Sequence, residues 1–126
     1  VVTATDVRQL QLAKGSIAAG LALLMRRLGL AAGDIAEILV AGTFGAFLRK
    51  ESLVAIGLLP PVDPERIRFV GNAAGAGARL MLADGGARRR AAETAARCEY
   101  VELAGDREYE AEFGKRLGLT ARSESH

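Results

Sequence analysis

The stretch Glu37-Ile-Leu-Val-Ala-Gly-Thr-Phe-Gly45 decides the fold that we expect for this chain. It begins as a short, continuous aliphatic run, which is typical of a strand buried on both faces, and it ends in a glycine-rich turn. Ile67-Arg-Phe-Val70 repeats the pattern and runs into Gly71-Asn72. We therefore expect two parallel strands whose carboxyl ends lie at one edge of a sheet, each followed by a glycine turn.

Helical patterns flank these strands. From Ala4 to Leu28 the apolar residues recur every three or four positions, as on one face of an α-helix. The residues of that face are Leu10, Ala13, Ile17, Leu21, Leu24 and Leu28. Thr3 and Asp6 have the signature of a capping box at the start of this helix, and Gly29 suits its end. Further helices are expected at residues 51–57, 73–83 and 87–97 and after Asp106, with a third strand at Tyr100–Leu103. This alternation predicts an α/β fold with a short, mainly parallel sheet and flanking helices.

Composition and charge restrict the class of protein. The 126 residues suffice for one domain, half of them are apolar, and the net charge is only +2. One cysteine, Cys98, and one histidine, His126, cannot form an internal disulfide or a Cys/His metal cluster. The charge is too mild and aromatic residues are too few to favour nucleic acid as a partner. The apolar runs are too short to cross a membrane and no signal peptide is visible, so we expect a cytoplasmic protein.

The glycine turns are the best candidates for a ligand site. Ligands of open α/β sheets bind at the carboxyl ends of the strands, where glycine lets them approach the backbone and free N–H groups at a helix start attract phosphate. Neither turn matches G-x-x-x-x-G-K-[ST] or a clean G-x-G-x-x-G. The alternative is that the glycines serve close packing of helix on sheet, and we prefer it for Gly75 and Gly77.

Four sequence blocks together resemble a known family. In chain order they are Asp6-Val-Arg-Gln-Leu-Gln-Leu-Ala-Lys14, Ile38-Leu-Val-Ala-Gly-Thr-Phe-Gly45, Ile56-Gly-Leu-Leu-Pro60 and Val70-Gly-Asn-Ala-Ala-Gly-Ala-Gly-Ala-Arg79. The series resembles the C-terminal part of the reductive activators of corrinoid proteins, over about residues 3–117. These activators are iron–sulfur proteins with an ATPase domain of the actin, sugar-kinase and heat-shock type, which has a ribonuclease H-like fold.

The resemblance implies a function and a set of contact residues. A [2Fe–2S] domain outside this chain, together with an ATPase domain that uses ATP or ADP with magnesium, would reduce a cobalt(II) corrinoid protein to cobalt(I). The turn Ala41-Gly42-Thr43-Phe44-Gly45 would lie against the nucleoside and its α-phosphate, and Gln11 and Lys14 would point toward the adenosine. Gly71 and Asn72 would make secondary contacts at most, and this second turn would pack its helix closely on the sheet. No catalytic or metal-ligating residue is implied in this chain.

The sequence also departs from a complete member of that family. The cysteines of an iron–sulfur cluster and the acidic phosphate-binding hairpins of the actin-like fold are absent. Residues 1–119 are therefore expected to form the C-terminal half of an actin-like ATPase subdomain, followed by a flexible tail at residues 120–126. The expected partners are a corrinoid protein and the remaining ATPase subdomains of the same polypeptide, and an exposed sheet edge would permit self-association.

Two other functions stay open at this point. One is a packing or interaction module whose glycines bind no ligand. The other is an activator or a small-molecule kinase from another branch of the same ATPase superfamily. A cysteine-rich [2Fe–2S] motif upstream would favour the corrinoid activator over the second alternative, and a nucleotide titration separates it from the first.

We expect no ATP hydrolysis by the chain on its own, because half of the nucleotide clamp of the actin-like fold is not part of it. The measurement is phosphate release by the purified chain in the presence of ATP and magnesium. Release above that of a boiled sample would contradict the expectation.

Overall fold

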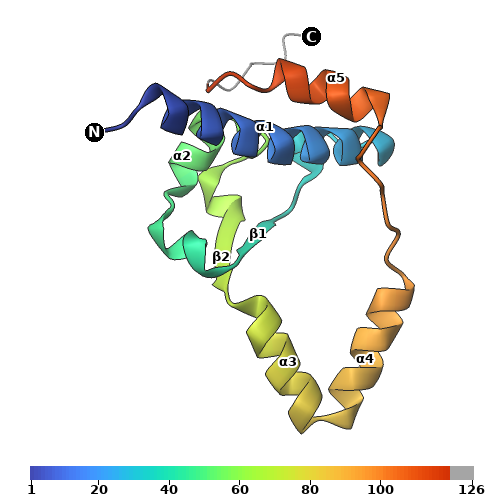
Figure 1. Ribbon diagram of the computed structural model, residues 1–126. Coiled ribbons are helices and arrows are strands. Elements are labelled where there is room, and N and C mark those ends of the chain that lie inside the picture. Colours follow the sequence, from blue (N-terminus) through green and yellow to red (C-terminus); the bar gives the residue numbers. More distant parts are fainter. Residues whose placement is uncertain (120–126) are drawn as a thin grey trace.

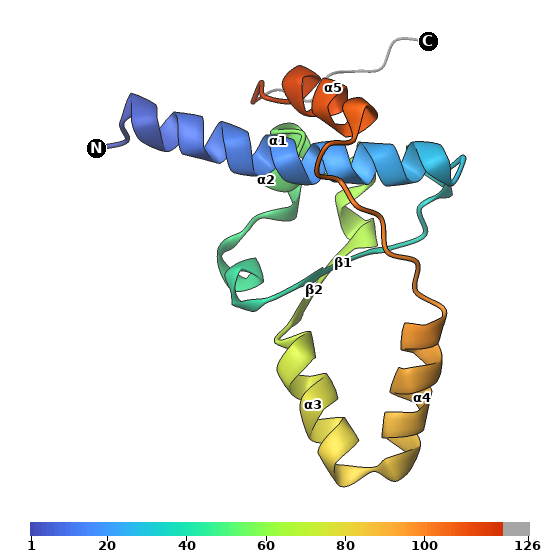
Figure 2. The same cartoon turned by 45° about the vertical axis from the view of Figure 1, so that its right-hand side comes forward.

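The structure, a computed structural model, describes residues 1–119 apart from the side chains of Phe44 and Ala46. The helices are α1 (Ala4–Arg27), α2 (Lys50–Ala55), α3 (Ala73–Ala83), α4 (Gly85–Ala96) and α5 (Arg107–Lys115). The strands are β1 (Ile38–Ala41) and β2 (Ile67–Gly71), and short 3₁₀ helices lie at η1 (Ala32–Asp34), η2 (Thr43–Phe47) and η3 (Pro64–Arg66). Helix α1 crosses the molecule, with the strands on one side of it and α5 on the other (Figures 1 and 2). The tail predicted for residues 120–126 lies outside the described residues.

The two strands pair in parallel, and the predicted α/β fold with flanking helices is confirmed. Val40 lies opposite Phe69, but the next pair is Ala41 with Gly71. The pairing thus skips one residue of β2, Val70, as in a β-bulge. This irregularity places the ends of the two strands side by side.

The third predicted strand, at Tyr100–Leu103, is wrong, because this segment does not join the sheet. It connects α4 to α5 and runs toward α1 (Figures 1 and 2). Tyr100 is 81% exposed and its hydroxyl donates to a Glu102 carboxylate oxygen over 2.8 Å, while Leu103 approaches Gly20 of α1. An extended segment forms a strand only where its backbone N–H and C=O groups pair with a neighbouring strand. Residues 100–103 do not lie beside β1 or β2, the strands of the sheet.

The core lies between α1, α2 and one face of the sheet. Its enclosed members are Leu53, Leu59, Val62 and Ile67. In β1 Val40 packs against this core, whereas its neighbour Leu39 is 55% exposed. The prediction that the strand is buried on both faces is therefore wrong, since the described residues cover only one face.

Helix α1 begins and ends at the predicted signals. The Asp6 N–H donates to the Thr3 hydroxyl at 3.2 Å and the Thr3 N–H donates to the Asp6 carboxylate at 2.8 Å, which completes the capping box. At the other end Gly29 has a φ of +65°, and the N–H groups of Gly29 and Leu30 donate to carbonyls of the last turn. This is the glycine-terminated helix end that the sequence predicts.

The buried face of α1 differs from the predicted one. Ile17, on the predicted apolar face, is 50% exposed, whereas Gly15, Ala18 and Ala19 are buried. Helix α1 is covered both by the core and by α5, and four of its six buried residues are glycine or alanine, whose small size lets both layers approach the helix closely. No helix in the described part of the chain is long and apolar enough to cross a membrane.

Helices α3 and α4 form a hairpin that leaves the sheet edge and points away from α1 (Figures 1 and 2). The two helices pack on each other, and neither contains a buried residue. The expected close packing of α3 on the sheet is therefore wrong. Helix α4 contains four alanines whose spacing would suit packing on a sheet, Ala91, Ala92, Ala95 and Ala96, but none of them is buried.

Gly45 sets the distance between η2 and β2. It is buried, and a Cβ built on it would lie only 2.8 Å from Cδ1 of Phe69. The ring of Phe69 belongs to the layer packed against the core, so it has little freedom to move aside. Gly77 in α3 is the opposite case, because nothing lies within 4 Å of a Cβ built there.

We expect Gly45→Ala to lower the free energy of unfolding by about 1–3 kcal/mol, since the added methyl group overpacks the contact with Phe69. Gly77→Ala should instead raise it by about 0.5–1 kcal/mol, because alanine is the better helix former and meets open space. Urea unfolding of the two variants measures both changes. Equal effects of the two substitutions would contradict the packing described for Gly45.

Candidate functional site

The two glycine turns meet at the carboxyl ends of the paired strands. Gly42 has a φ of +105° and Gly71 a φ of +62°, conformations that favour glycine. The N–H of Gly42 donates to the carbonyl oxygen of Gly71 over 2.8 Å, so the turns are tied together where the chain leaves the sheet. Among the described residues, no atom lies within 4 Å of a Cβ built on either glycine. The backbone at this point is therefore open to a ligand.

The neighbours of Gly42 are also accessible. Ala41 pairs with Gly71 and Thr43 begins η2, and both are exposed. Thr43 places a hydroxyl, which can donate or accept a hydrogen bond, directly after the glycine that bends the chain. The first turn thus combines open backbone with one polar side chain.

Asn72 follows the second turn and caps α3. Its Oδ1 accepts the N–H of Gly75 over 2.9 Å. A Cβ built on Gly75 would lie 2.6 Å from Nδ2 of Asn72, so the glycine makes room for the capping amide. The packing that explains Gly75 is thus local to the cap and does not involve the sheet.

Gly45 and Phe44 belong to the first turn in sequence but contribute differently. Gly45 is buried against Phe69, so it supports the turn from behind and presents no free surface. The side chain of Phe44 lies outside the described part of the structure. The residues that the structure brings together at the open edge are therefore Ala41, Gly42, Thr43, Gly71 and Asn72.

Lys14 lies elsewhere. The residue is only 2% exposed, and its ammonium donates to the carbonyl oxygens of Arg116, at 2.8 Å, and of Gly118. Burial, and then the nearby Arg116 guanidinium, lower the pKa of Lys14. These carbonyls follow the last turn of α5, where a helix leaves acceptors without intrahelical partners. Lys14 therefore fastens the end of α5 to α1.

The position of α5 bears on both predicted adenosine contacts. Helix α5 covers the side of α1 that faces away from the sheet (Figures 1 and 2). The side chain of Lys14 consequently points away from the glycine turns. Gln11 is half-buried one turn before it on α1. Neither residue is brought to the open edge of the sheet in this structure.

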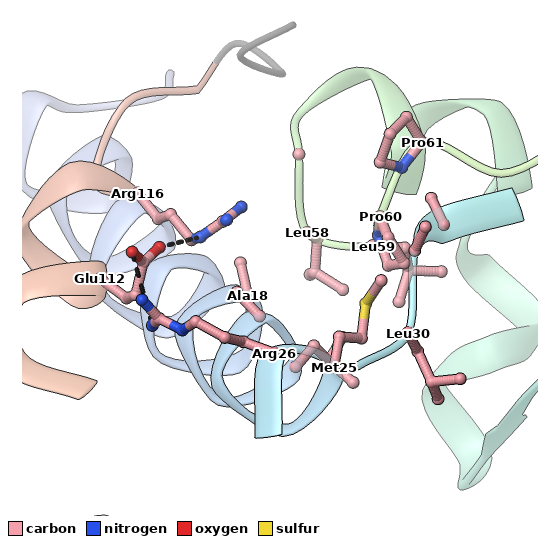
Figure 3. Close-up of a pocket in the computed structure, with 15 residues that line it drawn as sticks. Ala18, Met25, Arg26, Leu30, Leu58, Leu59, Pro60, Pro61, Glu112 and Arg116 are labelled. Atoms are coloured by element: carbon pink, nitrogen blue, oxygen red, sulfur yellow. Dashed lines mark hydrogen bonds and ion pairs between the residues drawn. The ribbon is translucent and has the colours of Figure 1, made fainter. Parts of the chain in front are cut away.

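A cavity of about 630 Å³ is present between α1, α5 and the Gly57–Pro61 loop (Figure 3). Met25, Leu30 and Leu58 give it apolar walls, and Arg26, Glu112 and Arg116 lie on its α5 side. None of its lining residues belongs to the glycine turns. Sequence reasoning missed this cavity, although the block Ile56-Gly-Leu-Leu-Pro60, which enters its wall, is part of the family resemblance.

Glu112 is the polar centre of the α1–α5 contact. Its carboxylate accepts hydrogen bonds from Lys115 and Arg116, each at 3.1 Å, and lies 3.7 Å from a guanidinium nitrogen of Arg26. Burial raises the pKa of the Glu112 carboxyl, but the hydrogen bonds from Lys115 and Arg116 outweigh it and hold that pKa below its usual range. Both this ion cluster and the buried Lys14 hold α5 against α1.

The described residues do not form a site for a metal ion. No group of three or more histidine, cysteine or acidic side chains gathers in residues 1–119. The single cysteine of the sequence, Cys98, cannot hold an iron–sulfur cluster that needs four thiolates. What the chain does offer is open glycine backbone, which fits a nucleoside and phosphate.

Comparison with known families gives a match over nearly the whole chain. The family described as the C-terminal domain of RACo, the ASKHA domain, matches residues 1–125. This agrees with the four sequence blocks and with the strand-turn-helix geometry at Gly42 and Gly71.

Two longer proteins are similar to the chain. The corrinoid activation enzyme RamQ of Eubacterium limosum is 42% identical over 82 residues, which are 65% of this chain and 14% of the relative. A solved structure titled reductive activator for corrinoid, iron-sulfur protein superposes with a TM-score of 0.86 at 30% identity, over 94% of this chain and 19% of that one. The chain thus spans less than a fifth of the length of either protein.

We expect Lys14→Met to lower the free energy of unfolding by about 1–3 kcal/mol, because it leaves carbonyls at the end of α5 without their buried donor. Lys50→Met is the matched control, since Lys50 has no side-chain partner within the described residues. Hydrogen exchange of the α5 amides should accelerate in the first variant only. Unchanged α5 protection combined with weaker ADP binding would instead assign Lys14 to the nucleotide.

Proposed function

This chain belongs to the family of RACo C-terminal ASKHA domains, and we propose that it forms the nucleotide-facing wall of an ATP-dependent reductive activator of corrinoid proteins. The observation that carries the proposal is the hydrogen bond between the Gly42 N–H and the Gly71 carbonyl. It joins two positive-φ turns at one sheet edge and leaves their backbone open, which is where α/β folds bind nucleotides.

The proposed contacts follow from this geometry. Ala41, Gly42 and Thr43 lie against the nucleoside and its α-phosphate, with Gly71 and Asn72 completing the edge. Gly42 lets the ligand reach the backbone because a side chain at this position would occupy the open space. Thr43 offers a hydroxyl for a hydrogen bond to the ligand. Gly45 acts indirectly, through the packing of η2 on Phe69.

Other parts of the longer protein have to supply the redox chemistry. In the longer protein, ATP would supply free energy for the reduction of cobalt(II) to cobalt(I), and the electron would come from a [2Fe–2S] cluster held outside this chain. The residues of this chain hold the nucleotide, and the docked helix α5 keeps α1 and the core below it in place. Magnesium would be bound by groups outside residues 1–119, where no cluster of metal-ligating side chains is present.

The alternatives from the sequence are less well supported. Close packing explains Gly45 and Gly75, which touch Phe69 and Asn72, but it does not explain Gly42 and Gly71, which face open space. A kinase or another activator of the same superfamily is disfavoured because both similar proteins carry corrinoid activation in their names.

Gly42→Ala in the longer protein tests the nucleotide contact. We expect it to weaken ADP binding about tenfold or more, because the methyl group enters the space proposed for the ligand. Gly29→Ala is the control for a positive-φ glycine with nothing within 4 Å of a Cβ. Because Gly42, at φ +105° and ψ 166°, lies in a region that is more restricted to glycine, the free energy of unfolding of both variants is measured alongside. Calorimetric titration with ADP measures both affinities.

Equal ADP affinity in the Gly42→Ala and Gly29→Ala variants would contradict the assignment of the site. The same proteins also allow cobalt(I) formation to be followed by the visible spectrum of the corrinoid. If the Gly42→Ala variant binds ADP normally but no longer forms cobalt(I), then Gly42 has a role other than nucleotide contact.

A further inference from the structure

The first glycine turn is held in place at both of its ends. At one end the Gly42 N–H donates to the carbonyl oxygen of Gly71 over 2.8 Å. At the other end Gly45 is buried, and a Cβ built on it would lie 2.8 Å from Cδ1 of Phe69. The segment proposed to contact the nucleotide is therefore anchored by one backbone hydrogen bond and by one contact with a side chain.

The 3₁₀ helix η2 connects the buried anchor to the open part of the turn. It runs from Thr43 to Phe47 with Gly42 as its N-cap, and the Leu48 N–H closes its end by donating to the Gly45 carbonyl oxygen over 3.3 Å. A 3₁₀ helix has only three residues in each turn, so a residue in its middle does not move without its neighbours. A displacement of Gly45 away from β2 would consequently also displace Thr43 and the backbone of Gly42.

The anchor at Gly45 consists of a single side chain. The three atoms nearest to a Cβ built there are Cδ1, Cγ and Cβ of Phe69, at 2.8, 3.3 and 3.5 Å. The ring at position 69 can lie this close to η2 only because position 45 has no side chain. The size of the ring and the missing Cβ together set the distance between η2 and β2.

The core fixes Phe69 from the opposite side. Phe69 lies opposite Val40 of β1, and both side chains pack against the core cluster, of which the fully buried Ile67 is a member. Side chains in a close-packed interior have defined positions, and a change of volume there is felt by their neighbours. The ring of Phe69 is therefore a firm support for η2, and it connects the core to the candidate site.

We propose that Phe69 is a positioning residue of the nucleotide site: its ring, held by the core, sets the height of η2 over β2 and thereby the place of Gly42 and Thr43 against the ligand. Phe69 acts through Gly45 and does not touch the nucleotide. The inference rests on the proposed function, because the position of the turn affects binding only if the nucleotide lies against it.

A purely structural role of Phe69 would have a different signature. Substitution would then lower the free energy of unfolding, but the protein that remains folded would bind ADP normally. A positioning role changes the affinity of the folded protein. It also predicts that a change at position 69 can be compensated by a change at position 45, since residues in contact are energetically coupled.

The test is a double-mutant cycle in the longer protein. Phe69→Leu removes part of the ring, and Gly45→Ala adds a methyl group toward it, so the double variant approximately conserves the volume between η2 and β2. Leu59→Val is the control, because Leu59 is 8% exposed in the same core cluster but belongs to the Gly57–Pro61 loop. Calorimetric titration with ADP gives the affinities, and urea unfolding gives the stabilities.

We expect each single substitution to raise the Kd for ADP about fivefold or more, and the double variant to bind ADP within about twofold of the wild type. Leu59→Val should lower the stability and keep the wild-type Kd. In glycine-selective ¹⁵N spectra without ADP, the Gly42 amide resonance should be displaced in both single variants and return toward its wild-type position in the double variant. The Gly105 resonance should stay in place.

Wild-type ADP affinity in both single variants, or losses that simply add in the double variant, would overturn the positioning role. An equal loss of affinity in Leu59→Val would do the same. If Phe69→Leu does not fold, Phe69→Met takes its place in the cycle, because the flexible methionine side chain fills irregular gaps.

The two proposals fail separately. If the positioning role is wrong, the wild type still binds ADP and Gly42→Ala still weakens that binding, so the proposed function stands. If the wild type does not bind ADP at all, the proposed function fails and the positioning role fails with it.

Discussion

The parallel pairing of β1 with β2 is the constraint on which the rest of the structure depends. Parallel strands cannot be joined by a tight turn, so residues 42–66 have to cross from one strand end to the other. That crossover contains α2 and the loop that supplies Leu53, Leu59 and Val62 to the core. The skipped residue in β2 then aligns the strand ends, so that the Gly42 N–H reaches the Gly71 carbonyl. The positions of the core and of the candidate site therefore both follow from the pairing of β1 with β2.

Local signals were sufficient to predict much of this from the sequence. The capping box of Thr3 and Asp6, the positive-φ glycine after α1 and the Asp106 cap of α5 depend on neighbouring residues, and each is confirmed. The features that failed depend on distant residues. Tyr100–Leu103 has strand composition but no strand beside it, and α3 follows a strand without folding back on the sheet. Tertiary position overrides composition in both cases.

The candidate site shows the same division. Proximity of the two glycine turns could be predicted, because parallel strands end at the same sheet edge. The sequence could not predict whether each glycine makes room for a ligand or for close packing. That depends on which atoms lie where a side chain would be: Phe69 for Gly45 and open space for Gly42. The role of Lys14 was also hidden, since its acceptors at Arg116 and Gly118 are about a hundred residues away in sequence and helical spacing alone does not identify them.

The central claim is that a nucleotide binds at the joined glycine turns, and glycine-selective ¹⁵N labelling of the longer protein tests it most directly. On addition of ADP with magnesium, the account predicts that the amide resonances of Gly42 and Gly71 shift together. Those of Gly29 and Gly105, which share the positive-φ conformation but lie away from the paired strand ends, should stay in place. Saturating ADP that leaves Gly42 and Gly71 unshifted would contradict the account.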